Sequence, residues 1–571
     1  MTYIPPIAEQ RFLLEHVVRL QELPGYDEFA DVVDAVLEGA GAFAAGEFAP
    51  LNRVGDQVGA KWSPEGVTMP PGFKEAYRAY VEGGWGTLAG PTEHGGQGLP
   101  LTLATVVMED LGSANMAFSL IMMLTPGTVE ALKHHGSAEL QRLWLPKLVS
   151  GEWSGTMNLT EPQAGSDVGA LKTRAVPRGD GTYSIVGQKI FITFGEHDLA
   201  DNIVHLVLAR LPDAPEGTRG ISLFLVPKFR LDDAGSTAEH NDVRCVSIEH
   251  KMGIHASPTC VMSYGDEGDC VGWVVGEENG GMRAMFTMMN NARLNVGLQG
   301  VSIAERATQA AVLYAGSRIQ SARAGWASRD PVPIIQHPDV RRMLLRMKAL
   351  TQAARALAYY AAGLTDRASL GNAGAKARAD LLTPLVKAYG TDVGVEVTSL
   401  GVQVHGGMGY IEETGAAQHY RDARISPIYE GTNGIQAADL VGRKLGLEGG
   451  AVLARLLTEI RSEAADEPQL MALVDACESV AEHLAMAETD DRLAASYSFL
   501  TMLSVAVSGW LMARQLRAAR EAEETSDFLE MKKAAARFYL DQVVPEAGGL
   551  TAAALAPAAI LYSVSEDAFA A

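Results

Sequence analysis

A change of pattern near residue 155 is the feature that most constrains the fold of this 571-residue chain. Before and after the segment 155–278, apolar residues recur near helical spacing, as in 27–45 and 280–320. Inside the segment, short runs rich in Ile, Val and Phe are bounded by Gly, Pro and Asp, which is typical of strands. The clearest runs are YSIVGQKIFIT (183–193), NIVHLVLARL (202–211) and GISLFLVPKF (220–229). The sequence therefore predicts a β domain between helical domains.

This pattern predicts an α+β fold that is mainly α, in a chain long enough for two to four domains. The expected parts are an N-terminal helical domain (1–154), a central β domain (155–278), a C-terminal helical domain (279–447) and an additional C-terminal helical domain (448–571). The first 150 residues are expected to be helical, with a Gly-rich loop at 90–100.

One uncharged stretch, Leu493–Ala513, has about the length that spans a bilayer. Because it contains four serines and a threonine, we predict a helix buried among other helices and no membrane insertion.

Composition excludes several classes of function. A formal charge of −22 argues against broad contact with nucleic acid, which requires a basic surface. The four cysteines form no CxxC pair, so neither a zinc site nor a disulfide framework is expected, and a reducing cytoplasm fits best. The N-terminus has no signal-peptide pattern. His405 and His419 lack the spacing of metal ligands, so we interpret them as structural and predict no metal.

Two motifs lie in or beside the β segment. LTEPQAGSD (159–167) is either a surface turn or a polar loop that offers hydroxyls and backbone N–H groups to a heteroaromatic ring. In GQKIFIT (187–193), Phe191 and Thr193 are two residues apart and so share one face of a strand. They are either ordinary core and strand residues or a ring and a hydroxyl for a flat cofactor.

A third region, SPIYEGTNGIQ (426–436), carries one acid, Glu430, between an aromatic residue and a glycine. Thr432 or Asn433 is expected to cap the helix that follows, and Asn433 with Gln436 fits a capping box. From spacing alone, Glu430 is either a turn residue or a base. No GxGxxG dinucleotide motif follows a strand into a helix.

LTEPQAGSD, GQKIFIT, QVHGGMGY and IYEGTNGIQ resemble, in order and spacing, the motifs of the acyl-CoA dehydrogenase family of flavoenzymes. The resemblance covers roughly residues 30–447 and implies a β-barrel-like central domain (155–278) and a four-helix-bundle C-terminal domain (279–447). HKMGIHASPTCVM (250–262), EGTNGIQAADLVGRKL (430–445) and the extra C-terminal segment look most like the longer subgroup of 3-methylmercaptopropionyl-CoA dehydrogenase and its relatives.

The resemblance implies FAD, an acyl-CoA substrate and α,β-dehydrogenation of the thioester. Glu430 matches the family's catalytic base, and Arg293, Ser166 and Gly431 match positions close to the substrate. The implied FAD contacts are Leu159, Thr160, Ser166, Phe191, Thr193, Arg318, Gln403, Gly406, Gly407, Thr432 and Asn433. Phe191 takes the place of the ring-stacking aromatic residue, and Thr193 that of a hydroxyl near flavin N5.

In the family, the positions of Arg318 and Gln403 serve the FAD of a neighbouring subunit, which implies a homodimer or homotetramer. An electron-transfer flavoprotein is the implied electron acceptor. The chain departs from the family at Ser321, where Phe is frequent, and at Gly434, where Gln is frequent.

Three alternatives remain open from the sequence. An acyl-CoA oxidase would share the fold but pass electrons to oxygen. A noncatalytic, DNA-binding flavoprotein of this fold is disfavoured by the acidic charge. The acyl group is either 3-methylmercaptopropionyl or a short-to-medium straight chain. Four methionines, which are either an acyl lining or helix core, do not decide this: Met282, Met285, Met288 and Met289.

Overall fold

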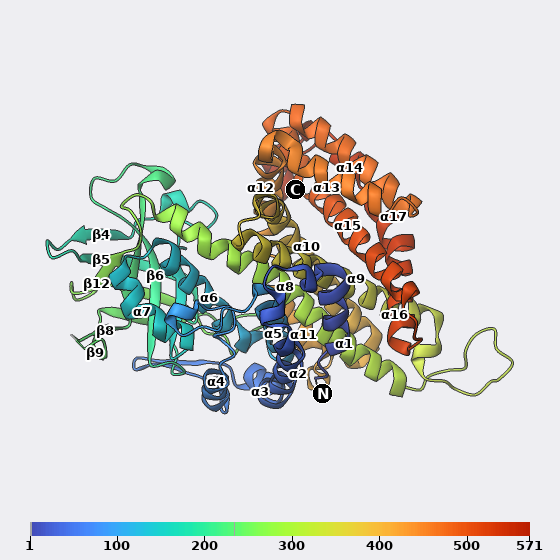
Figure 1. Cartoon of the computed structure of the whole chain (residues 1–571), viewed down its shortest axis with the longest axis horizontal. Coiled ribbons are helices and arrows are strands. Elements are labelled where there is room, and N and C mark those ends of the chain that lie inside the picture. The colour runs from blue at the N-terminus through green and yellow to red at the C-terminus, as the bar shows by residue number, and fades with distance from the viewer. Residues whose placement is uncertain (1–2, 233) are drawn as a thin grey trace. The chain divides into compact units, whose positions relative to one another are not determined.

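The computed structural model describes residues 3–232 and 234–571, which cluster into two compact units (Figure 1). The helical unit comprises Pro6–Glu38 and Val296–Ala571, and the sheet unit comprises residues 3–5 together with Gly39–Asn295. The chain is mainly helical and contains one large sheet, which confirms the predicted fold class. The three boundaries between the four predicted domains stay a prediction, and the first helix groups with the C-terminal ones.

Five helices of the sheet unit precede its main sheet: α3 (Ala49–Val58), α4 (Phe73–Glu82), α5 (Leu101–Ala114), α6 (Met116–His135) and α7 (Ala138–Ser150). Asn115 separates α5 from α6 and caps α6, because its side chain accepts a hydrogen bond from the Phe118 N–H at 3.1 Å. Ser137 caps α7 in the same way, because its hydroxyl accepts a hydrogen bond from the Leu140 N–H at 3.2 Å.

The expectation that the first 150 residues are helical apart from the loop at 90–100 is wrong at one place. A two-stranded antiparallel hairpin, β1 (Lys61–Ser63) and β2 (Gly66–Thr68), interrupts the helices. Strands of three residues are too short to produce a recognisable alternating pattern.

The main sheet has eight strands: β3 (Trp153–Asn158), β4 (Arg174–Pro177), β5 (Tyr183–Thr193), β6 (Asn202–Arg210), β7 (Ile221–Pro227), β10 (Val243–Ile248), β11 (Thr259–Tyr264) and β12 (Val271–Val274). Their order is β10-β11-β5-β12-β7-β6-β3, and β4 pairs with both β5 and β6. The β3–β6 pairing is parallel, whereas β6–β7 and β11–β5 are antiparallel. A separate ribbon joins β8 (Phe229–Leu231) to β9 (Thr237–His240).

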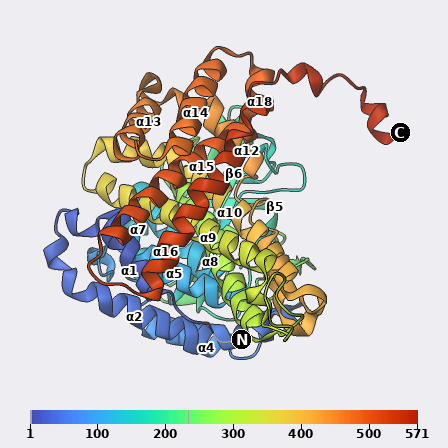
Figure 2. The same cartoon turned by 90° about the vertical axis from the view of Figure 1, so that its right-hand side faces the viewer.

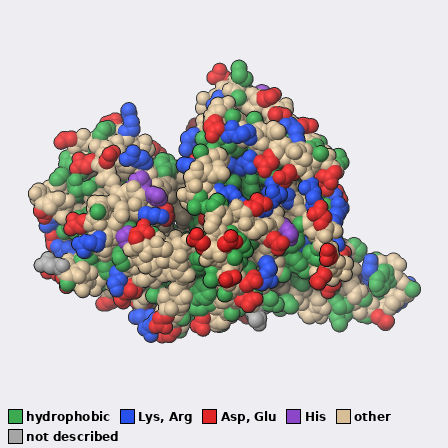
Figure 3. All heavy atoms as spheres, viewed as in Figure 1, with side chains coloured by type: hydrophobic (Ala, Val, Ile, Leu, Met, Phe, Trp, Pro, Cys, Tyr) green, Lys and Arg blue, Asp and Glu red, His purple; other side chains and the backbone are tan. Residues whose placement is uncertain are grey.

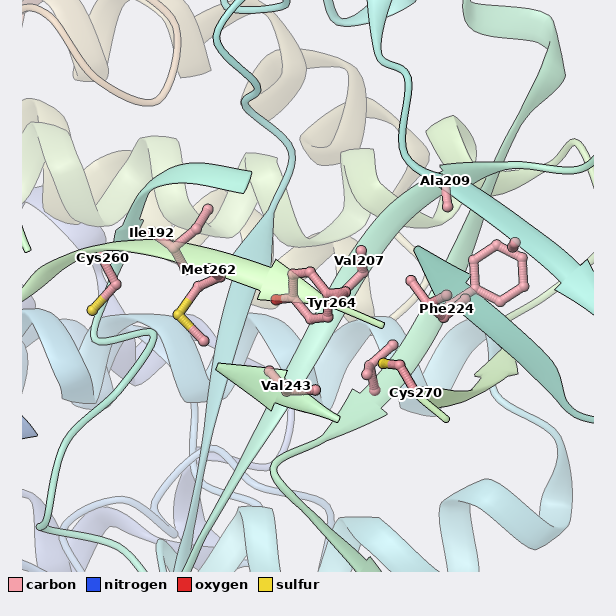
Figure 4. Close-up of a cluster of buried hydrophobic side chains, with 12 residues drawn as sticks. Ile192, Val207, Ala209, Phe224, Val243, Cys260, Met262, Tyr264 and Cys270 are labelled. Atoms are coloured by element: carbon pink, nitrogen blue, oxygen red, sulfur yellow. The ribbon is translucent and has the colours of Figure 1, made fainter. Parts of the chain in front are cut away.

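A buried apolar cluster fixes which way the long strand β5 faces (Figure 4). Ile192 of β5 lies in this cluster with Cys260 and Met262 of β11 and Phe224 of β7. Because Ile192 is buried, its neighbours Phe191 and Thr193 are directed away from the core.

The helical unit contains α1 (Ile7–Leu13), α9 (Pro338–Ser369), α10 (Ala373–His405), α11 (Ala416–Ala423) and α12 (Asn433–Gly442). Two helices, α2 (Val33–Phe43) and α8 (Gly281–Ser317), run through the boundary between the units. The C-terminal extension adds α13 (Ala451–Glu463), α14 (Pro468–Met486), α15 (Thr489–Glu521), α16 (Asp527–Phe538), α17 (Val544–Gly548) and α18 (Thr551–Ala554) (Figure 2).

Helix α15 is the central helix of this extension. Among the described residues it is the one helix long and apolar enough to cross a membrane, and 83% of its most apolar window is buried. This confirms the prediction of a buried helix at Leu493–Ala513. Buried polar contacts join the extension to the rest of the unit, including Tyr539 to Tyr389 at 2.6 Å and Lys532 to Glu9 at 2.9 Å.

Candidate active site

The loop 159–167 lies against β5 in the sheet unit. The Ile190 N–H donates to the Thr160 carbonyl at 2.9 Å, and the Lys189 ammonium donates to the Leu159 carbonyl at 3.0 Å. Ser166 is exposed, whereas Leu159 and Thr160 are half-buried. The structure therefore brings the first predicted motif next to the second.

The buried side chain of Glu161 fixes the base of this loop through hydrogen bonds and an ion pair. Its carboxylate accepts hydrogen bonds from Lys189 at 2.8 Å, from the Thr173 hydroxyl at 2.6 Å and from two backbone N–H groups, those of Lys172 and Thr173. Burial alone would raise the pKa of Glu161, but the charge of Lys189 and these hydrogen bonds lower it to about 2. Burial lowers the pKa of Lys189 to about 8, although Glu161 opposes that shift. Both groups are thus charged at neutral pH.

Phe191 is unusual in backbone and in exposure. Its φ is +61°, a left-handed conformation that is uncommon outside glycine, and the register between β5 and β11 shifts beside it. Its side chain is 58% exposed although it is large and apolar, and Thr193 is half-buried. Backbone strain combined with an exposed ring indicates a position selected for binding rather than for packing.

The acid Glu430 lies in a tight turn ahead of α12 in the helical unit. Its φ is +56° and that of Gly431 is +80°, and the Asn433 N–H closes the turn by donating to the Pro427 carbonyl at 3.0 Å. The side chain of Glu430 is half-buried. Burial, followed by the charge of Glu430, raises the pKa of Tyr429, whose hydroxyl donates to Gln299 of α8. A non-glycine residue in this conformation again marks a functional candidate.

Spacing alone left Thr432 and Asn433 as alternative caps of α12, and the structure distinguishes them. Thr432 is the N-cap, because its hydroxyl accepts from the Ile435 N–H at 3.1 Å. The capping box between Asn433 and Gln436 does not form, since the Gln436 side chain donates instead to the Gly431 carbonyl at 3.3 Å.

Asn433 is 3% exposed and its amide is directed into the protein. Its oxygen accepts from the Lys387 ammonium at 2.9 Å, and its nitrogen donates to the Ala388 carbonyl at 3.2 Å and to Asp392 at 2.8 Å. The side chain therefore anchors the turn to α10, while its predicted contact with FAD stays a prediction.

The same cluster continues into the C-terminal extension. The Tyr497 hydroxyl of α15 donates to the second carboxylate oxygen of Asp392 at 2.7 Å. Burial raises the pKa of Asp392, and the hydrogen bonds from Tyr497 and Asn433 oppose that shift. Tyr497, Asp392 and Asn433 thus form a continuous polar connection from the extension to the turn that carries Glu430.

The predicted residues for a neighbouring FAD lie at the ends of two adjacent helices. Tyr314 of α8 stacks on His405 of α10, with ring centroids 4.5 Å apart. One turn beyond Tyr314, Arg318 is exposed, and Gln403, Gly406 and Gly407 are exposed at the end of α10. Gly406 has φ +60° and ψ −140°, a conformation that favours glycine, and the space around both glycines is open.

Two further expectations concern α8 within the sheet unit. Arg293, predicted close to the substrate, is buried. Met285 and Met288 are also buried, and Met288 packs so closely on Gly127 of α6 that a Cβ there would lie 2.8 Å from its Cγ. For these two methionines the core interpretation is confirmed. Met282 and Met289 are half-buried.

The sequence analysis missed the side chains that anchor both loops: the buried Glu161, Lys189 and Lys387, the half-buried Asp392 and the exposed Tyr497. One signal was available for the first pair, because a lysine in an apolar strand and an acid in a turn each depart from their local pattern. No comparable signal links Tyr497 to Asp392, which are 105 residues apart.

Comparison with known proteins agrees with the motifs. The chain matches the acyl-CoA dehydrogenase N-terminal (34–152), middle (156–266) and C-terminal (279–445) domains, and an acetyl-CoA dehydrogenase C-terminal-like domain (456–564). It is similar to an acyl-CoA dehydrogenase complexed with FAD from Bacillus anthracis, with a TM-score of 0.76, 22% identity and coverage of 95% of this chain and 90% of that one.

Two curated relatives extend over nearly the whole chain. A butyryl-CoA dehydrogenase of Syntrophomonas wolfei is 36% identical over 93% of both chains. A 3-methylmercaptopropionyl-CoA dehydrogenase of Ruegeria pomeroyi is 47% identical over 96% of this chain and 97% of that one. The domain matches and these full-length identities show that the chain belongs to the acyl-CoA dehydrogenase family and is an oxidoreductase.

Proposed function

We propose that the protein is an FAD-dependent acyl-CoA dehydrogenase that converts an acyl-CoA thioester to a 2-enoyl-CoA, with Glu430 as the base. The strained, half-buried Glu430 in IYEGTNGIQ carries the proposal. Its carboxylate removes the proton on the α-carbon. The backbone N–H of Glu430, by family resemblance, donates to the thioester carbonyl, where negative charge develops. The small neighbour Gly431 leaves room for the thioester.

The turn suits this role because hydrogen bonds hold the residues that follow Glu430 in the chain. Thr432 caps α12, and Asn433 is locked into α10, so few conformations are open to Glu430. The N-terminus of α12 favours the ionised carboxylate, which is the form required to accept a proton. Partial burial opposes ionisation and strengthens the base.

FAD fits the residues of the sheet-unit motifs. When bound, it supplies the acceptor for the hydride that leaves the β-carbon. The exposed ring of Phe191 offers a stacking surface, and Thr193 and the loop 159–167 offer hydroxyls and backbone N–H groups beside it. Arg318, Gln403, Gly406 and Gly407 are exposed and open, as residues serving a neighbour's FAD must be.

We propose 3-methylmercaptopropionyl-CoA as the substrate, with butyryl-CoA as the second candidate. The support is the identity of 47% with the relative named for the first substrate and 36% with the one named for the second. Flavin bleaching with each thioester under anaerobic conditions tests this order. Faster bleaching by butyryl-CoA would reverse it.

The test of the base is Glu430→Gln. This variant should keep its FAD absorbance and melting temperature and lose about 10²–10⁴-fold in the rate of flavin reduction, which is the usual contribution of a positioned base. The matched control is Glu413→Gln, the same change at an exposed acid 17 positions earlier in the chain. Reduction of Glu430→Gln at the parental rate would remove Glu430 from this role.

The remaining proposals concern acceptor, assembly and compartment. We propose an electron-transfer flavoprotein as acceptor, and rapid peroxide formation without it would identify an oxidase instead.

A homodimer or homotetramer is supported by Tyr410, 86% exposed, and Met408, 50% exposed, beside Gly406 and Gly407. Light scattering measures this state directly. Cytoplasmic localisation rests on the lack of any CxxC pair among the four cysteines.

A further inference from the structure

An arginine-lined cavity lies inside the helical unit, apart from the residues assigned above. It has a volume of about 320 Å³, within the range of small-molecule sites. Five arginines line it, Arg19, Arg367, Arg378, Arg455 and Arg514, with a single carboxylate, that of Glu459. The chain as a whole is strongly acidic, with a formal charge of −22, and Figure 3 shows acidic and basic side chains intermingled on the face in view. A concentration of cations in one cavity is therefore a departure from the chain as a whole.

Three of these arginines are held firmly in the walls. Arg367 donates to the backbone carbonyls of Val18 at 2.9 Å and Arg19 at 3.0 Å. Because carbonyl groups carry no net charge, these contacts leave the positive charge of Arg367 uncompensated. Arg378 donates to Glu459 at 2.6 Å. Such contacts fix the guanidinium groups and hold their charge at the cavity.

Arg514 is the most buried of the wall arginines. It donates to both carboxylate oxygens of Glu463, at 2.5 and 2.7 Å, and stacks on the ring of Trp510 at 4.1 Å. Its position is thus set by the C-terminal extension, which supplies one side of the cavity.

The other two arginines are exposed and free to respond to a ligand. Arg455 pairs with Glu448 at 2.6 Å, but their side chains are 52% and 49% exposed, and such pairs contribute little stability. The guanidinium of Arg19 donates no hydrogen bond within residues 3–232 and 234–571, although its charge lowers the pKa of Glu463. Both side chains can turn to an anion at small energetic cost.

Two helix N-termini also meet the cavity. The lining includes Asn372, Gly374 and Ala375 at the start of the 33-residue α10, and Val452 at the start of the 13-residue α13. The N-terminal end of a helix carries partial positive charge and favours phosphate. The two helix ends therefore add partial positive charge to that of the five arginines. Three carboxylates pair with these arginines: Glu448, Glu459 and Glu463.

From this arrangement we propose that the cavity binds a small molecule carrying a phosphate or diphosphate group. Guanidinium groups match the oxygens of phosphate in pairs, and five of them against three carboxylates leave an excess of positive charge for a multiply charged anion. The ligand bridges the bundle helices α9 and α10 to α13 and α15 of the extension, so its binding stabilises the attachment of the extension. The site is independent of the proposed catalysis.

The test is calorimetric titration of the full-length, FAD-loaded protein with pyrophosphate at constant ionic strength. One saturable site per chain is expected, and Arg19→Ala combined with Arg455→Ala should weaken it at least ten-fold. The matched control is Arg461→Ala, on the same helix α13 and paired with Asp475 at 2.9 Å, but outside the cavity lining. This control should bind pyrophosphate as the parent does.

Parallel titrations separate the possible sources of the phosphate. Tighter binding of ATP than of pyrophosphate identifies a nucleotide ligand, and the reverse order identifies a free diphosphate. Flavin reduction by substrate should be unchanged in the double variant. No saturable heat with either probe, equal binding by the double variant and the parent, or an equal loss in Arg461→Ala would each overturn the proposal.

Discussion

Two loops carry predicted catalytic and cofactor-binding residues, and a fully buried lysine side chain holds each loop in place. Beneath 159–167, Lys189 is 0% exposed and contacts the carboxylate of Glu161 at 2.8 Å. Beneath the Glu430 turn, Lys387 is also 0% exposed, but it contacts the amide oxygen of Asn433 at 2.9 Å. The first anchor is an ion pair between neighbouring segments, and the second is an amide that leads through Asp392 to Tyr497 of the extension.

Because their anchors differ, the two loops depend on different parts of the chain. The ion pair is confined to the sheet unit, so the loop 159–167 should respond to charge and pH but not to changes in the extension. The amide connection makes the turn of Glu430 depend on α15, which gives the C-terminal extension a part in holding the proposed base. The following changes test this contrast.

The largest effect is expected for Lys189→Met. Removing one partner of a buried ion pair leaves the other charge uncompensated and typically costs 3–5 kcal/mol. The free energy of unfolding, measured by urea titration of the parent and the variant, should fall by about that amount. The control, Lys172→Met, changes an exposed lysine 17 positions earlier and should stay within about 0.5 kcal/mol of the parent.

A second substitution shows whether charge is the cause. Lys189→Met combined with Glu161→Gln should recover much of the loss, because a neutral amide still accepts from Thr173 and needs no cation. No recovery in this double variant would mean that packing, not the ion pair, dominates at Lys189.

The sequence predicted the exposed parts of the site and missed the parts that support them. LTEPQAGSD, GQKIFIT and IYEGTNGIQ are local patterns, and strand β5 runs over the predicted 183–193 without correction. These features depend on residues a few positions apart, which a sequence displays directly.

The anchors depend on residues brought together by folding. Asn433 meets Lys387 from 46 positions away, and Tyr497 meets Asp392 from 105. The left-handed backbone of Phe191 and Glu430 was also unpredictable, because neither residue type favours it and only the surrounding contacts impose it. The hairpin β1–β2 was missed for a different reason, since its strands are three residues long.

A pH dependence should distinguish the ion-paired loop from the amide-anchored turn. The pKa of Glu161 is lowered from 4.5 to about 2, so its ionised form stabilises the fold fully above pH 4.5. Each unit of pH below 4.5 should remove about 1.4 kcal/mol of that contribution, until pH 2. Urea titrations from pH 6 to 3 should therefore show the advantage of the parent over Glu161→Gln shrinking as pH falls. A constant difference would contradict the lowered pKa.

Tyr497→Phe tests whether the extension supports the proposed base. The change removes the donor to the half-buried Asp392 at 2.7 Å and should lower the free energy of unfolding by about 1–2 kcal/mol. If the connection positions Glu430, flavin reduction should slow several-fold while the Kd for acyl-CoA stays unchanged. Tyr562→Phe, at an exposed tyrosine of the same extension, is the control for stability and rate. Lower stability with an unchanged rate would limit Tyr497 to a structural role.

The smallest effect is expected for Thr432→Ala, at the cap of α12. Loss of an N-cap hydroxyl costs about 1 kcal/mol, and Thr432→Ser should restore most of it because serine caps equally well. The two variants together compare the short-range cap with the long-range anchor at Asn433. If the cap alone set the position of Glu430, Thr432→Ala would slow flavin reduction more than Tyr497→Phe. The buried contacts of Asn433 predict the opposite order, because they fix the same turn from three sides when the cap is absent.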